Sequence, residues 1–209
     1  RIAVHALRAT SLARPLDPPA LPTTGDLGMG ELPFTSMALS FRLFGVSDWA
    51  GRLPLAVWGL CGALSLYLLL ARLLHPRAGF FGVLALLSMP LYFLHARTML
   101  GDIVTMAALA MGVAGLSLAA VERAPLTRAL ALGWGALGLL AGYLTRGALF
   151  GLAAPLVSVG VALLLAAPAR AHRWRSHAVG ALFVIGGAVA LAWFLRLALP
   201  LVEARTASS

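Results

Sequence analysis

The side chains of this sequence that could do chemistry are a few carboxylates and arginines placed beside long apolar segments. Only seven acids occur in 209 residues, and four of them, Asp17, Asp26, Glu31 and Asp48, lie in the N-terminal quarter. A carboxylate can accept a proton, and a guanidinium group can bind an anion. Ionised groups beside a bilayer are costly and usually mark a functional site. This pattern predicts a polar site at the edge of a membrane scaffold.

The composition defines the class of protein. Hydrophobic residues make up 61% of the chain and charged residues 11%, whereas a soluble domain has about 25% charged residues. The net charge is +9, and every basic residue other than histidine is arginine. Arginines at the ends of apolar segments indicate topology and contact with lipid headgroups. We therefore expect an integral membrane protein whose partners include membrane lipids and no nucleic acid.

Apolar segments long enough to cross a bilayer, at about 20 residues each, follow one another through most of the chain. Six qualify: 53–74, 78–95, 103–121, 129–145, 148–167 and 178–201. Their connections are short, so neighbouring helices should be antiparallel, and recurrent glycines should let them pack closely. The expected fold class is all-α, a polytopic transmembrane helical bundle of about six spans.

The remainder of the chain divides around this bundle. Residues 1–52 should form an outer-face loop with juxtamembrane helices, residues 53–201 the transmembrane domain, and residues 202–209 a polar tail. Within the loop, Pro33 should begin an interfacial helix of about a dozen residues, by analogy with other amphipathic helices of the interface. Ser47 is a candidate N-cap for the helix that follows.

The arginines predict the orientation. Seven fall on one side of the six segments, which the positive-inside rule makes cytoplasmic: Arg72, Arg77, Arg123, Arg128, Arg170, Arg173 and Arg175. Arg97, Asp102, Arg146 and the acid-bearing N-terminal loop then lie on the opposite, outer face. We expect a multi-pass protein of the bacterial inner (plasma) membrane with its site on the periplasmic face.

Three motifs in order resemble a known family. They are LSFRLFGVSDWAGRLP before the first span, SMPLYFLHARTMLGD between the second and third, and GYLTRGALFGLAAPL between the fourth and fifth. Together they resemble polytopic glycosyltransferases of the GT-C superfamily, namely protein O-mannosyltransferases and aminoarabinose (lipid A) transferases. The family has Lys-Pro-Pro after an acid where this chain has Glu31-Leu32-Pro33, and Thr-Lys-Gly-Pro where this chain has Thr145-Arg146-Gly147-Ala148. The resemblance covers residues 25–167.

The resemblance implies transfer of a sugar from a polyprenyl-phosphate carrier to an acceptor at the outer face. It assigns the carrier phosphate to Arg97 and Arg146, and catalytic or acceptor contacts to Asp102 and Glu31. We expect no cofactor and see no set of metal ligands. The family also has an Asp-Glu pair after a preceding span, which this chain lacks. We therefore expect residues upstream of Arg1, and we expect the chain alone not to catalyse.

Each assignment has a structural alternative. The two arginines could extend to lipid headgroups, Asp102 could favour a helix N-terminus through the helix dipole, and Glu31 could be a solvated loop acid. A transporter-like protein and a non-catalytic polytopic subunit are the rival functions. Transporters place ionisable groups near the midplane, whereas charges here stand at span ends, with Arg196 as the nearest exception. This placement favours an interfacial enzyme.

Overall fold

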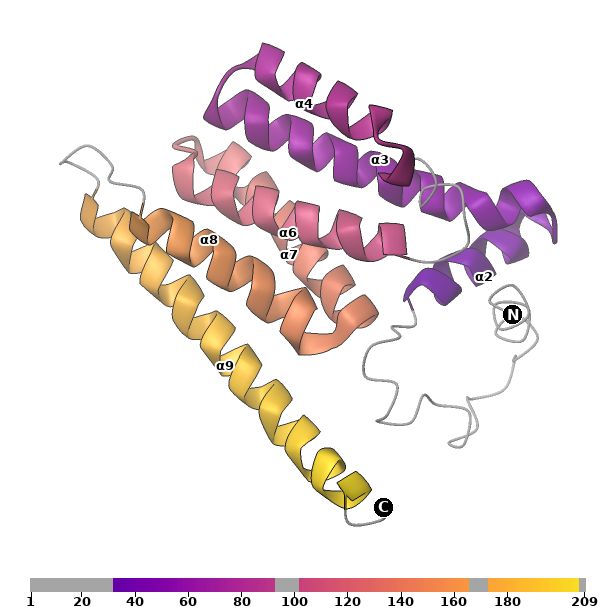
Figure 1. Cartoon of the computed structure of the whole chain (residues 1–209). Coiled ribbons are helices and arrows are strands. Elements are labelled where there is room, and N and C mark those ends of the chain that lie inside the picture. The colour runs from indigo at the N-terminus through magenta and orange to yellow at the C-terminus, as the bar shows by residue number, and fades with distance from the viewer. Residues whose placement is uncertain (1–31, 93–101, 166–172, 207–209) are drawn as a thin grey trace.

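The computed structural model describes residues 32–92, 102–165 and 173–206, and nearly all of them are helical (Figure 1). In chain order the elements are α2 (Leu32–Phe44), α3 (Asp48–Leu73), α4 (Pro76–Ser88), α6 (Asp102–Val121), α7 (Pro125–Ala148), the short π-helix η3 (Leu149–Ala153), α8 (Ala154–Leu165) and α9 (Arg173–Thr206). The predicted all-α polytopic bundle is confirmed.

Within the described residues, four helical stretches are long and apolar enough to cross a membrane: Asp48–Leu73, Ile103–Val121, Pro125–Leu165 and His177–Arg196. The third is 41 residues long and includes the fourth predicted span, 129–145, and residues 148–165 of the fifth. The predicted 178–201 segment extends further at both ends, as α9. The apolar segments therefore follow the predicted order, but their boundaries differ.

The second predicted span, 78–95, contains a break in the helix: α4 ends at Ser88, and residues 90–92 are helical again. α4 has only 13 residues, about 20 Å at 1.5 Å per residue, which is too short to cross a bilayer. It ends where Met89 adopts an extended backbone, with φ −71° and ψ 119°. Pro90 follows, and a proline ring pushes the preceding residue out of the helical region. Residues 93–95 lie outside the described part of the chain.

The first predicted span begins earlier than expected, because α3 starts at Asp48 and contains Pro54 in its interior. A proline has no N–H, so it leaves the carbonyl four residues earlier without a helical donor. That carbonyl belongs to Ala50, and the buried hydroxyl of Ser40 on α2 donates to it at 2.6 Å. This bond fastens α2 against the start of α3. Ser47 occupies the predicted N-cap position, but its side chain makes no capping hydrogen bond.

Glycines set the packing of α6 against α7, as the sequence predicted. A Cβ atom added at Gly115 would lie 2.2 Å from the backbone nitrogen of Gly135, and one added at Gly138 would lie 2.3 Å from that of Gly112. The two backbones are therefore in direct contact. The numbers rise on one helix as they fall on the other, so the two helices are antiparallel.

The 41-residue stretch is divided by a reversal at Gly147. Gly147 has φ 70° and ψ −167°, a conformation that essentially only glycine adopts. Beyond it the chain folds back, so that Gly151 meets the backbone of Gly142. α8 then packs against α6 and α9. The chain therefore changes direction at the predicted boundary between the fourth and fifth spans.

Candidate active site

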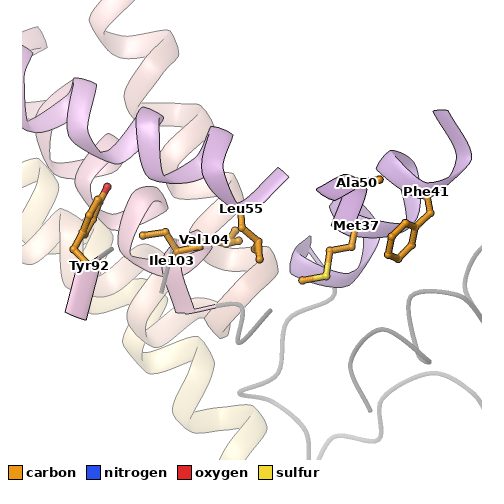
Figure 2. Close-up of a cluster of buried hydrophobic side chains, with 7 residues drawn as sticks. All are labelled: Met37, Phe41, Ala50, Leu55, Tyr92, Ile103 and Val104. Carbon is orange, nitrogen blue, oxygen red and sulfur yellow. The ribbon is translucent and has the colours of Figure 1, made fainter. Parts of the chain in front are cut away.

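One end of the bundle is built by the first turns of α3 and α6 and by α2 (Figure 2). Seven buried side chains form its core: Met37, Phe41, Ala50, Leu55, Tyr92, Ile103 and Val104. They come from α2, from the adjacent start of α3, and from two segments further along the sequence, at Tyr92 and at the start of α6. Ile103 and Val104 are 0% exposed, and so is Leu55. The start of α6 is thus packed against α3, and α2 packs against the start of α3 in the same cluster.

Tyr92 ties the chain after α4 to this core. Its hydroxyl donates to the carbonyl of Gly59 at 2.5 Å, and its side chain is buried. Gly62 leaves room for the ring, since a Cβ atom there would lie 3.1 Å from the tyrosine oxygen. Tyr92 and the first buried residues of α6, Ile103 and Val104, therefore belong to the same core cluster.

Two of the four predicted site residues fall within the described segments. Asp102 is the first residue of α6, immediately before the buried Ile103, and only its backbone is described. Arg146 lies near the end of α7 and is exposed. Glu31 and Arg97 lie outside the described residues; Glu31 directly precedes α2. Their predicted roles are therefore not tested by the structure.

The register of α6 and α7 brings Arg146 and Asp102 to the same level. Gly112 lies opposite Gly138, and Gly115 lies opposite Gly135. Continued along the two antiparallel helices, this register places Arg146 level with Val104, two residues after Asp102. α2 also contacts α7, which brings the segment after Glu31 to the same end.

Local structure explains how Arg146 is held. Its neighbour Thr145 is 2% exposed and donates to the carbonyls of Ala141 and Gly142 at 2.9 and 3.0 Å. The next residue, Gly147, makes the reversal. Arg146 is therefore on the last regular turn of a rigid helix, between a buried residue and a glycine-dependent turn. Its predicted place in the motif corresponds to a defined point in the fold.

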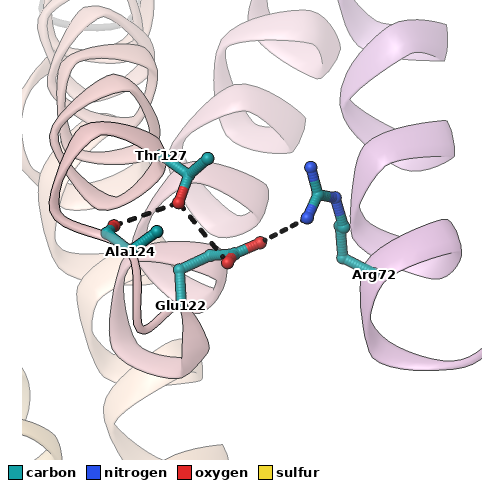
Figure 3. A network of polar contacts seen from close by, with 4 residues as sticks. All are labelled: Arg72, Glu122, Ala124 and Thr127. Atoms are coloured by element: carbon teal, nitrogen blue, oxygen red, sulfur yellow. Dashed lines mark hydrogen bonds and ion pairs between the residues drawn. The ribbon is translucent and has the colours of Figure 1, made fainter.

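The opposite end of the bundle has a different polar arrangement (Figure 3). Arg72, at the end of α3, forms an ion pair with Glu122 at 3.0 Å. Thr127 lies 3.5 Å from the other oxygen of Glu122 and donates to the carbonyl of Ala124 at 3.0 Å. Four arginines that the sequence assigned to one side, Arg72, Arg77, Arg123 and Arg128, belong to this end. The two ends are therefore chemically distinct.

Sequence reasoning missed several residues that position the site. The sequence carried a signal for Ser40, because a proline at position 54 of a helix leaves the carbonyl of Ala50 without a backbone donor. The bond from Tyr92 to Gly59 had no local signal. Neither did the ion pair between Arg72 and Glu122, which lies at the opposite end of the bundle. No group of three or more metal-ligating side chains occurs among the described residues.

The fold and the placement of charged side chains define a class: an integral membrane protein with an all-helical polytopic body and ionisable groups at its helix ends. Comparison with protein families agrees with this class. The model of the dolichyl-phosphate-mannose-protein mannosyltransferase family matches residues 32–198. The chain belongs to this family, which makes it a membrane glycosyltransferase of the GT-C type. No curated protein and no solved structure gives a significant match.

Proposed function

We propose that the protein transfers a sugar from a polyprenyl-phosphate carrier to an acceptor hydroxyl at the outer face of a bacterial inner membrane. Asp102 and Glu31 serve as the carboxylates in this proposal, and Arg97 and Arg146 bind the carrier phosphate. The observation that carries it is the register of α6 and α7, which brings Arg146 level with the start of α6.

The proposed chemistry needs one carboxylate and fixed cations. The acceptor hydroxyl gives its proton to a carboxylate while its oxygen attacks the anomeric carbon. The bond from that carbon to the phosphate oxygen breaks, and the electron pair leaves with the carrier phosphate. Arginine suits this role because it remains charged and grips phosphate oxygens with two parallel hydrogen bonds.

The membrane context supports the same arrangement. The carrier is a lipid, so its phosphate must stay near the boundary while its tail remains in the bilayer. In the described residues, Arg146 stands at the end of an apolar helix whose outer surface is exposed, including Leu140 and Leu144. A site at this end of the bundle can therefore be reached from within the membrane.

The test is sugar transfer by the protein expressed from its complete coding sequence, with radiolabelled polyprenyl-phosphate mannose as donor. Asp102→Asn and Arg146→Gln should each reduce transfer by about 100-fold or more, as removal of a group that stabilises developing charge does in other enzymes. Arg128→Gln is the matched control, because it removes an exposed arginine from the other end of the same helix.

Expression level and melting temperature should be unchanged in all three variants. Normal transfer by Asp102→Asn and Arg146→Gln would refute the site assignment. An equal loss in Arg128→Gln would show that the arginines of α7 act through insertion or stability and not through the reaction.

A further inference from the structure

Two aromatic rings at the proposed end of the bundle are stacked across α7 and α9. The ring centroids of Tyr143 and Trp193 lie 6.3 Å apart, and the planes differ by 11°. Both side chains are partly exposed, at 39% and 50%. Fifty residues separate them in the sequence, so the pair exists only because α9 returns to α7.

Each ring is followed by an arginine one helical turn further along. Arg146 is three residues after Tyr143, and Arg196 is three residues after Trp193. Residues three apart lie on the same face of a helix, about 4.5 Å apart along the axis. α7 and α9 run in the same general direction from the Arg72 end of the bundle (Figure 1). The two arginines therefore come to similar levels, beyond the same aromatic pair.

This arrangement opens toward lipid. The apolar window of α9 is only 17% buried, so α9 forms an edge of the bundle. Arg196 and Arg146 are both exposed. The two arginines lie one helical turn beyond the aromatic rings, on a face that lipid can reach. This arrangement suits a ligand with a phosphate at the membrane–water boundary and an unsaturated hydrocarbon chain in the bilayer.

We infer that Arg196 is a second phosphate-binding arginine, paired with Arg146, and that the Tyr143–Trp193 stack contacts the first isoprene units of the carrier. This inference rests on the proposed function and extends it, because it adds a residue from α9 to the site. Two arginines provide more donors than one and can bind different oxygens of the same phosphate. The same phosphate chemistry occurs in ordinary anionic lipids, so the experiment must separate the two sources.

The experiment measures binding, without any sugar, by native mass spectrometry of the purified protein in phosphatidylcholine nanodiscs. The probe is undecaprenyl phosphate, and the competitors are phosphatidylglycerol and inorganic phosphate. Arg196→Gln and Arg146→Gln should each weaken binding of the probe roughly tenfold, because each removes a charge-assisted contact. Trp193→Leu should weaken binding less, and Arg196→Lys should retain part of the affinity.

Arg128→Gln is again the control, since it should leave binding unchanged. If Arg146→Gln loses affinity and Arg196→Gln does not, the second arginine is refuted and the proposed function stands. If phosphatidylglycerol displaces the probe at equal concentration, the two arginines bind anionic lipid headgroups in general and the inference is overturned. If neither variant changes binding, the phosphate role in the proposed function fails as well.

Asp102→Asn separates a loss of catalysis from a loss of carrier binding, because it should reduce transfer by about 100-fold or more while binding the probe normally. Melting temperatures of all variants guard against loss of fold. An Arg196→Gln protein that melts like the unmodified one and binds the probe as tightly overturns the inference without ambiguity.

Discussion

Substitution of Gly138 by alanine tests whether backbone contact between α6 and α7 sets the geometry of the site. A Cβ atom at Gly138 would lie 2.3 Å from the nitrogen of Gly112 and 2.8 Å from the carbonyl oxygen of Ala108. Both are backbone atoms and cannot rotate away. The helices must therefore separate, by about 1 Å, to reach ordinary van der Waals distance.

The same substitution at Gly133 provides the matched control on the same helix. A Cβ atom at Gly133 meets nothing within 4 Å. Both variants gain helix propensity of about 1 kcal/mol over glycine, so the gain cancels when the two are compared. The remaining difference is overpacking, about 1–3 kcal/mol. Gly138→Ala should thus be less stable than Gly133→Ala by this amount.

The effect on activity should exceed the effect on stability. Arg146 stands on α7, and Asp102 stands on α6, so separation of the helices moves one relative to the other. A displacement of about 1 Å between catalytic groups can lower a rate by about 100-fold. Sugar transfer by Gly138→Ala should therefore fall strongly while Gly133→Ala remains active.

The assays are thermal unfolding of the purified proteins in detergent and sugar transfer at a temperature where both variants are folded. If Gly138→Ala unfolds at the same temperature as Gly133→Ala and transfers sugar normally, the close contact between α6 and α7 does not position the site. A loss of stability with full activity would retain the packing explanation but refute its link to catalysis.

Three further outcomes are expected. Ser40→Ala should destabilise the protein by about 1–3 kcal/mol, because a buried carbonyl loses its donor. This loss of stability should largely disappear in a protein that also carries Pro54→Ala, where the helix supplies its own N–H. A double-mutant cycle by thermal unfolding measures this coupling. Gly147→Asn and Gly147→Ala should each be destabilised by about 1–3 kcal/mol in the same assay. Asparagine should not rescue the turn, because ψ −167° lies far from the left-handed region that asparagine tolerates. Normal stability of the asparagine variant would contradict the observed turn. In intact cells of a cysteine-free background, a membrane-impermeant maleimide should label Val46→Cys but not Leu126→Cys, although both positions are about equally exposed at 69% and 71%; the reverse pattern would place the proposed site in the cytoplasm.

The sequence was informative where one physical effect dominates. Long apolar runs must be helical in a bilayer, because every backbone polar group needs an internal partner. The order of the helices followed from this. The recurrent glycines predicted close helix packing, and the structure shows that α6 and α7 are the helices that meet at them. The sequence was less informative where prolines act. A break before Pro90 interrupts the helix predicted over 78–95, whereas Pro54 does not end a helix, because Ser40 donates to the carbonyl that the proline leaves without a partner.

The Thr145-Arg146-Gly147 segment shows why the site could be predicted only in part. Its motif predicted an arginine at a span end, and the positive φ of Gly147 gives a physical reason for the glycine. Which residue lies near that arginine depends on α9, because Trp193 of α9 stacks on Tyr143, which is 50 residues earlier in the sequence. Hydrophobicity specifies that α9 is a membrane helix but not which helix it meets. The second arginine therefore follows from packing, and binding of a lipid phosphate by Arg196 would show that α9 belongs to the active site.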